Sequence, residues 1–147
     1  MRIVVDTNIV FSAILNSNSR IAAILLQPKS KQRFYTTYQL LTEIEEHRNK
    51  LKKLTSLSDL ELSNLISITT RQIKFIYIQL VPFEIYQKVK VLTTDVDVEN
   101  TAFVALAEHL GAKLWTGDKV LINGLAQKGW NKFISTNELF EILLANE

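Results

Sequence analysis

The sequence contains no cysteine and, among its 147 residues, only two histidines, four glycines, two prolines and one methionine. Without cysteine it cannot form a disulfide framework, a zinc finger, an iron–sulfur cluster or a thiol nucleophile. His47 and His109 lack the spacing of a transition-metal site, and glycine-rich phosphate loops of the GxxxxGK[ST] or GxGxxG type are missing. Any catalytic chemistry therefore depends mainly on carboxylates, hydroxyls, amides, lysine and arginine.

Long apolar runs are missing as well. The longest fall far short of the roughly 18–20 residues that a membrane helix needs. The N-terminal run, Arg2 to Val5, has no extended apolar core of the kind found in a secretory signal peptide. We therefore expect a cytoplasmic protein with no membrane partner. The net charge of +2 permits nucleic-acid binding without arguing for it.

What the chain does have is the composition of a folded domain, with 47% hydrophobic and 22% charged residues. Its length and the lack of a Gly/Ser/Pro-rich linker predict a single domain over residues 1–147. Apolar runs typical of strands lie at 2–5, 34–36, 73–81, 113–116 and 133–134. Helical patterns lie at 9–15, 21–27, 38–54, 57–70, 83–92, 100–110, 120–128 and from 135 or 136 onward. This alternation predicts an α/β sandwich with a parallel sheet.

Local signals mark several helix ends. Thr36 with Gln39 resembles a capping box that opens the 38–54 helix, and Ser58 is the expected N-cap of the 57–70 helix. Gly111 stands where a C-cap should close the 100–110 helix. His47 falls on the apolar face of the 38–54 helix, which favours packing over catalysis.

Two carboxylates follow predicted strands directly. Asp6 comes after the first strand and Asp118 after the fourth. Ligands of open parallel sheets bind beyond the carboxyl ends of the strands, so this placement indicates a site. An N-cap role in the following helix is the structural alternative for each residue.

Further acids fall near the same edge of the sheet. Glu43 lies at the border of the apolar face of its helix, near the helix start, and an ordinary solvent-facing glutamate is the alternative. The segment 95–100 carries Asp95, Asp97, Glu99 and Asn100 into the next helix, where acids are also routine complements of the helix dipole. Clustered carboxylates need a hard cation, and all-oxygen ligation suits Mg²⁺ or Mn²⁺.

Three segments, in order, then match a known family: Val4 to Asn8 (VVDTN), Gln39 to Ile44 (QLLTEI) and Phe103 to Asp118 (FVALAEHLGAKLWTGD). With them the whole chain resembles the PIN domain, a metal-dependent ribonuclease fold that includes the VapC-type toxins of toxin–antitoxin pairs. The resemblance implies a PIN-like three-layer α/β/α sandwich whose five-stranded parallel sheet has the order 3-2-1-4-5.

The resemblance also implies roles for individual residues. Asp6, Glu43 and Asp118 match three acidic positions of the family, and Asn100 stands where the remaining acid is expected. Either metal binding is weakened there, or Asp97 or Glu99 supplies the missing carboxylate beside Asp6 and Asp118. Polar family positions are matched by Thr7, Asn8 and Thr116, which would orient the carboxylates or merely cap helices.

The activity implied is hydrolysis of RNA phosphodiester bonds with Mg²⁺ or Mn²⁺ as cofactor, leaving a 5′-phosphate and a 3′-hydroxyl. Glu43 would position the attacking water or a second ion. Cations available to hold RNA are Lys29, Lys31 and Arg33, and Arg48 in the basic stretch 47–53, which otherwise reads as a solvated helix face. Tyr35, Tyr38 and Trp115 are candidates for base stacking, although a tryptophan in a strand is more often core.

An antitoxin protein and a second copy of the chain are the expected protein partners. A surface for either partner, or else part of the core, is formed by three leucines at helical spacing: Leu57, Leu60 and Leu65. Two other functions compete with a toxin nuclease. One is a PIN-like module, weakened at Asn100, that binds RNA or a partner protein. The other is a phosphatase with Asp6 as nucleophile, which the asparagine at position 8 argues against because a second acid is expected there.

Overall fold

In the computed structural model, which describes residues 1–27 and 31–145, five strands form one parallel sheet in the order β3-β2-β1-β4-β5. The strands are β1 (Arg2–Val5), β2 (Arg33–Thr37), β3 (Ile73–Ile76), β4 (Lys113–Trp115) and β5 (Phe133–Ile134). All four strand pairings are parallel. The predicted α/β class and strand order are therefore confirmed.

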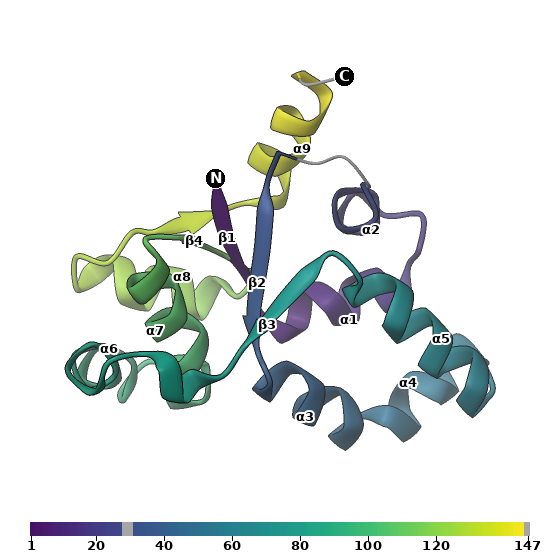
Figure 1. Ribbon diagram of the computed structural model, residues 1–147, viewed down its shortest axis with the longest axis horizontal. Helices are drawn as coiled ribbons and strands as arrows, with labels where there is room; N and C mark the ends of the chain where they lie inside the picture. The colour runs from purple at the N-terminus through teal and green to yellow at the C-terminus, as the bar shows by residue number, and fades with distance from the viewer. Residues whose placement is uncertain (28–30, 146–147) are drawn as a thin grey trace.

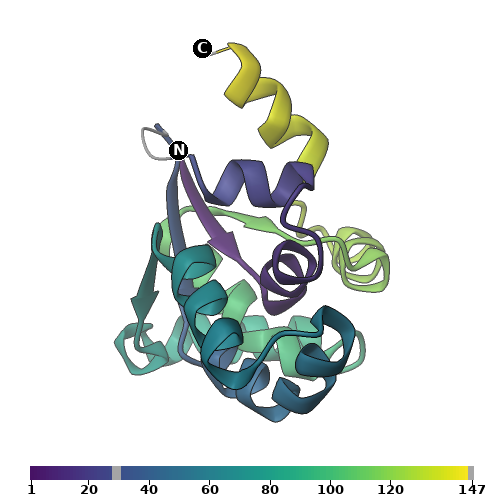
Figure 2. The same cartoon turned by 90° about the vertical axis from the view of Figure 1, so that its right-hand side faces the viewer.

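Helices flank this sheet (Figures 1 and 2). Because crossovers between parallel strands are right-handed, the helices that follow β1 and β2 lie on one face, and those on either side of β4 in sequence lie on the other. The first group is α1 (Thr7–Leu15), α2 (Arg20–Leu25), α3 (Gln39–Glu46), α4 (Arg48–Thr55) and α5 (Asp59–Thr70). The second is α6 (Phe83–Thr93), α7 (Thr101–Leu110) and α8 (Lys119–Gln127). Short 3-10 turns are η1 (Ile78–Leu80) and η2 (Val98–Asn100), and α9 (Thr136–Ala145) packs against α2.

The central helix α7 is the most deeply buried helix next to the carboxyl ends of the strands. Every residue from Thr101 to Ala107 is buried, because α7 lies between the sheet and α6. Its end, at Gly111, adopts the left-handed conformation (φ 61°) that favours glycine, as expected for a C-cap. Since α7 contacts β1, β2 and β4, its N-terminus is held at a fixed place relative to the strand ends.

Trp115 belongs to the core. Its side chain has no solvent exposure, its ring packs on Phe34, and its indole N–H donates to the Thr136 hydroxyl at 3.0 Å. Of the two alternatives for Trp115, the core position is confirmed and base stacking is excluded by its burial. Tyr35 is half-buried, whereas Tyr38 is 40% exposed and stacks on Tyr77, with ring centroids 4.5 Å apart.

The predicted 38–54 helix is two helices. The chain leaves helical geometry at His47 (φ −105°, ψ 13°), whose ring packs edge-on against Phe11, so α3 ends there and α4 begins in a new direction. The predicted capping box is also wrong, because Thr36 lies inside β2 and its hydroxyl donates to the Val5 carbonyl at 2.8 Å. The 73–81 strand stops at Ile76, where η1 replaces it. The N-cap at Ser58 is confirmed, with a complete capping box to Glu61.

No helix in the described ranges 1–27 and 31–145 is long and apolar enough to cross a membrane.

One close contact ties α8 to the acidic segment before α7. A Cβ built on Gly124 would fall 2.5 Å from Val96 Cγ1. Alanine normally stabilises a helix interior by about 1 kcal/mol relative to glycine. We expect Gly124→Ala to lower the free energy of unfolding instead, because the segment around Val96 has to move away from α8. Urea denaturation measures this change. In a Val96→Ala background the same substitution should become neutral or stabilising, and a stabilising effect in the unchanged chain would contradict the tight contact.

Candidate active site

Asp6 and Asp118 lie at the point where the strand order reverses. β1 and β4 are neighbours in the sheet, and the register pairs Val5 with Trp115, so the residues that follow the two strands leave the sheet side by side. In open α/β sheets this switch point is where ligands bind. A pocket of about 150 Å³ opens there, and all eight described residues that line it are polar: Asp6, Thr7, Asn8, Glu43, Asp97, Glu99, Asn100 and Asp118.

Both aspartates also cap helices. One carboxylate oxygen of Asp6 accepts from the Ile9 amide at 3.2 Å, which caps α1. Asp118 accepts from the amides of Val120 and Leu121 at 3.0 and 3.2 Å, which caps α8. The capping role and the pocket role therefore coincide. Each cap uses the Oδ1 atom, so the rotation of both side chains is fixed by helix geometry.

Asp6 is the most deeply buried acid, with 1% of its side chain exposed. Burial raises its pKa from the ordinary 3.8 to about 6, because the ionised form loses hydration, and the nearby Asp118 charge acts in the same direction. Hydrogen bonds from the Thr116 hydroxyl and from the amides of Ile9 and Asn8 oppose this shift. Thr116 also accepts from the Asp118 amide at 3.1 Å, so its hydroxyl links the two aspartates. Asn8 touches Asp6 through its backbone, while its side chain is exposed.

Glu43 reaches the pocket from α3, one turn after the start of that helix. The Gln39 side-chain amide donates to Glu43 Oε1 at 2.6 Å and to the Glu99 carbonyl at 2.7 Å. Through these two hydrogen bonds Gln39 links the Glu43 side chain to the backbone of the η2 turn. Sequence reasoning missed this residue by assigning it to a capping box. Its position four residues before Glu43, on the same helix face, was the signal that could have found it.

Of the polar residues that were candidates in the 95–100 segment, Asp97, Glu99 and Asn100 line the pocket and Asp95 does not. The Asn100 side-chain amide donates to Asp97 Oδ2 at 2.7 Å, so the amide at the expected acid position holds a carboxylate three residues earlier. Glu99 is exposed and contributes to the rim. Asp95 turns away and forms an ion pair with Lys128 on α8.

The donor set fits a hard divalent cation. Five carboxylates line the pocket, and none of the described residues around it is a lysine, arginine or histidine, so their charge is uncompensated. The Thr7 hydroxyl oxygen is buried in the same wall and has no hydrogen-bond partner. As the side chains stand, no three acidic or histidine residues of 1–27 and 31–145 are grouped as a ready metal site. Because the caps fix Asp6 and Asp118, ion binding would require the side chains of Glu43, Asp97 or Glu99 to move toward them.

A family model described as the PIN domain matches residues 4–139. The chain belongs to the PIN domain family. Members of this family are typically metal-dependent ribonucleases, and the all-oxygen pocket agrees with that chemistry.

Solved structures share this PIN fold. The crystal structure of VapBC2 from Rickettsia felis bound to a DNA fragment from their promoter aligns with a TM-score of 0.67 at 15% identity, over 92% of this chain and 97% of that chain. VapBC-1 from nontypeable Haemophilus influenzae aligns with a TM-score of 0.64 at 16% identity, over 93% and 99% respectively. At these identities the likeness establishes the fold. No curated protein matches the sequence.

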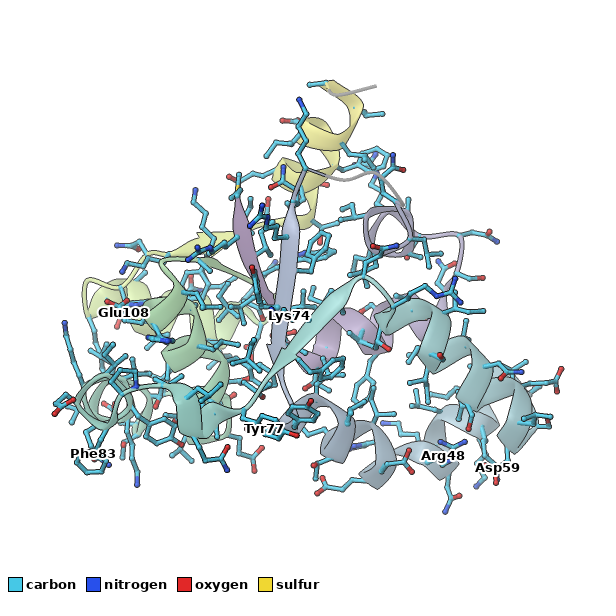
Figure 3. All side chains as sticks on the ribbon, in the orientation of Figure 1. Arg48, Asp59, Lys74, Tyr77, Phe83 and Glu108 are labelled. Carbon is cyan, nitrogen blue, oxygen red and sulfur yellow. The ribbon has the colours of Figure 1, made fainter. Side chains whose placement is uncertain are left out.

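The cations predicted to hold RNA do not surround the acidic pocket of this PIN domain. Arg33 opens β2, so it lies at the opposite edge of the sheet from the pocket, and Lys31 precedes it. Arg48 is engaged with α5, where its Nε lies 2.9 Å from Asp59 Oδ1 (Figure 3). Lys29 lies outside the described residues. These positions do not support a role for Lys31, Arg33 or Arg48 at the mouth of the pocket.

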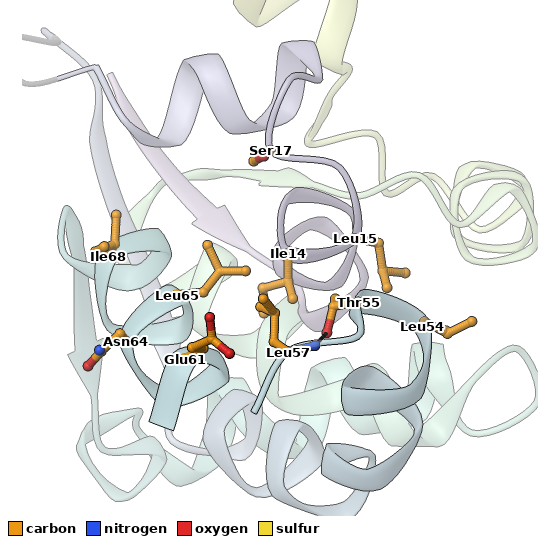
Figure 4. Close-up of a pocket in the computed structure, with 10 residues that line it drawn as sticks. All are labelled: Ile14, Leu15, Ser17, Leu54, Thr55, Leu57, Glu61, Asn64, Leu65 and Ile68. Carbon is orange, nitrogen blue, oxygen red and sulfur yellow. Dashed lines mark hydrogen bonds between the residues drawn. The ribbon is translucent and has the colours of Figure 1, made fainter. Parts of the chain in front are cut away.

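Two hollows flank the acidic pocket of the PIN domain. The α1–α8 hollow, of about 550 Å³, shares Asn8 and Asp118 with it. The α3–α7 hollow, of about 340 Å³, shares Glu43 and Glu99. A separate groove of about 560 Å³ lies between α1, α4 and α5 (Figure 4). We call it the apolar groove after six of its ten lining residues, Ile14, Leu15, Leu54, Leu57, Leu65 and Ile68; the other four are polar.

The raised pKa of Asp6 predicts how stability responds to pH in metal-free protein. Because the folded state holds the Asp6 proton more tightly than the unfolded state, the free energy of unfolding should rise as the pH falls through 6 and level off near 3.8. The full difference is about 3 kcal/mol. Urea denaturation in EDTA at pH 7.5, 6 and 5 measures about half of this difference, since the rest develops between pH 5 and 3.8. Asp6→Asn should remove this contribution and be more stable at pH 7.5, and an unchanged pH profile in that variant would contradict the shift.

Proposed function

We propose that this PIN domain is a metal-dependent endoribonuclease of the VapC toxin type. The observation that carries the proposal is the pocket at the carboxyl ends of β1 and β4, which Asp6, Glu43, Asp97 and Asp118 line with no cation among the described lining residues. Such a pocket attracts a hard divalent ion, Mg²⁺ or Mn²⁺, and gives it only oxygen donors. Access to RNA places the proposed activity in the cytoplasm.

Asp6 and Asp118 are the proposed principal metal ligands, since both are held rigid by the helices they cap. A bound ion would polarise the scissile phosphate and lower the pKa of a water molecule. Glu43, held by Gln39, accepts a hydrogen bond from the attacking water and orients its oxygen toward phosphorus. In the hydrolysis the new bond joins the water oxygen to phosphorus and the bond to the 3′ oxygen breaks, which leaves a 3′-hydroxyl and a 5′-phosphate.

Asp97 is proposed to supply the carboxylate that the sequence lacks at position 100. Its side chain lines the pocket and is half-buried, and the Asn100 amide donates to its Oδ2 atom. An amide donor orients a carboxylate while leaving its charge intact, so the pair preserves one negative charge near the start of α7. Thr7, with its unpaired hydroxyl, and Thr116 would orient the remaining ligands.

A second candidate function follows from the same asparagine. If Asn100 weakens metal binding, the chain would act as a PIN-like module that binds RNA or a partner without cleaving it. The short hydrogen bond between Asn100 and Asp97 favours the nuclease, because it keeps a carboxylate in the pocket.

An antitoxin protein is the proposed partner. Its support is the likeness to chains of VapBC complexes together with the apolar groove between α1, α4 and α5. Leu54 is 59% exposed and Leu15 46% exposed on the groove walls, although such side chains usually lie against other apolar groups. An amphipathic segment of the antitoxin would cover them. Leu57 and Leu65 line this groove, and a homodimer stays a prediction.

Cleavage tests the nuclease directly. Purified protein with Mn²⁺ should cut a mixture of structured and single-stranded RNAs, and EDTA should abolish the activity. Asp6→Asn, Asp118→Asn and Asp97→Asn should each reduce the rate by about a hundredfold or more, because each removes a proposed ligand. Asp95→Asn is the matched control, since Asp95 is near in sequence but pairs with Lys128. Mn²⁺ binding by calorimetry that Asp6→Asn abolishes would favour the nuclease, whereas no metal binding together with no cleavage would contradict the nuclease and favour the binding module.

Substitution in the apolar groove tests the partner. Coexpression with the product of the gene immediately upstream should give a stable complex, and Leu54→Asp should weaken that complex at least tenfold by placing a charge against the apolar partner segment. Val91→Asp on α6 is the control, because Val91 is also strongly exposed but lies outside the groove. Equal effects of the two substitutions would count against this groove as the docking surface.

A further inference from the structure

We infer that the RNA strand lies in the α1–α8 hollow on one side of the acidic pocket and avoids the α3–α7 hollow on the other. This inference rests on the proposed ribonuclease function, because it assigns the path of the substrate to one of two neighbouring hollows. Both hollows open directly from the pocket, since each shares two of its lining residues.

Charge separates the two hollows. The α3–α7 hollow is lined by three glutamates, Glu43, Glu46 and Glu99, with His47 as the residue there able to carry a positive charge. The α1–α8 hollow contains a single acid, Asp118, and one cation, Lys119. A phosphodiester strand is repelled by clustered carboxylates and attracted by lysine. The electrostatic difference therefore favours the α1–α8 side.

The chemistry of the α1–α8 hollow also matches a nucleotide. Its apolar wall consists of Ile9, Ile21 and Val120, against which a base or ribose can pack. Asn8 and Ser12 stand on the exposed side of α1 and face the same space. Within residues 1–27 and 31–145 the side chains of Asn8, Ser12 and Lys119 form no hydrogen bond or ion pair, so all three are available to a ligand. The volume of about 550 Å³ lies in the range of small-ligand sites, about 300–1,000 Å³.

The position of Lys119 indicates in which direction the RNA strand would leave the acidic pocket. Lys119 is the first residue of α8, directly after the capping Asp118, and it is exposed. Lys119 lines the α1–α8 hollow together with Asp118, whereas Glu43 lines the α3–α7 hollow on the other side of the pocket. A phosphate next to the scissile one would meet Lys119 as the strand leaves the acidic pocket. Ser12, one turn along α1 from Asn8, lies further into the hollow, where the following nucleotide would lie.

Binding of a fluorescein-labelled ten-nucleotide oligouridylate, measured by fluorescence anisotropy in EDTA so that no cleavage occurs, tests this path. Lys119→Gln should weaken binding several-fold and reduce the slope of log K against log salt by about 0.7, the value for one phosphate contact on a single strand. Lys53→Gln on α4 is the charge-matched control and should leave the slope unchanged. Ser12→Phe should fill the hollow and weaken binding about tenfold.

Thr42→Phe is the matched substitution in the α3–α7 hollow, because Thr42 is also exposed on a helix beside the acidic pocket. It should leave the affinity within twofold of the unchanged chain, and thermal unfolding checks that each variant is folded. A loss of affinity in Thr42→Phe but not in Ser12→Phe, or no loss in either, would overturn the inference. RNA cleavage that is unaffected by Lys119→Gln and Ser12→Phe would overturn it while leaving the nuclease intact. RNA binding through this hollow without any cleavage would instead count against the proposed nuclease.

Discussion

The structure of this PIN domain depends on one parallel pairing, that of β1 with β4. The pairing sets Val5 opposite Trp115, so that Asp6 and the Thr116–Asp118 turn leave the sheet together. It also puts Asp6 in a nearly water-free position, where its carboxylate loses hydration without gaining a cationic partner. The core around Trp115 and α7 stabilises the pairing. A bound cation would offset the unfavourable free energy of ionising the buried Asp6 carboxyl.

The acidic pocket is held by contacts that each serve two purposes. Asp6 and Asp118 satisfy the first amides of α1 and α8 while presenting oxygens to the pocket. Gln39 links α3 to η2, and Asn100 holds Asp97. The close contact between Gly124 and Val96 keeps the same segment against α8. Asp6 and Asp118 keep their positions because moving either carboxylate would also break a helix cap.

The two hollows beside the pocket differ in charge, and this difference is the basis of the proposed RNA path. Carboxylates dominate the α3–α7 side, whereas the α1–α8 side combines apolar walls with an unpaired lysine. The apolar groove lies apart from both, between α1, α4 and α5 (Figure 4). Helix α1 contributes to the pocket through Thr7, to the α1–α8 hollow through Ser12 and to the groove through Leu15. A partner bound in the groove would therefore contact the helix that carries the rim of the substrate path.

The sequence by itself determined the class of fold and the acids of the site. The alternation of short apolar runs with helical patterns is a local property, and so is the position of Asp6 and Asp118 directly after strands. Helix ends were predicted where the cap is local, as at Ser58 and Gly111. Glu43 was a candidate from its place in the chain and the family pattern, and Asp97 was one of the alternatives for the missing acid; both line the pocket.

Only the tertiary structure decided the contacts between elements that are distant in sequence. At His47 the helix breaks and the ring packs on Phe11, and the Thr36 hydroxyl bonds to the Val5 carbonyl; neither contact leaves a local pattern in the sequence. Gln39 donates to the Glu99 carbonyl 60 residues away, and Arg48 forms an ion pair with Asp59 on the next helix. Local propensity acts over a few residues, whereas the burial of Asp6 and the pairing of side chains arise only when the β1–β4 edge, α3 and the start of α7 are packed together.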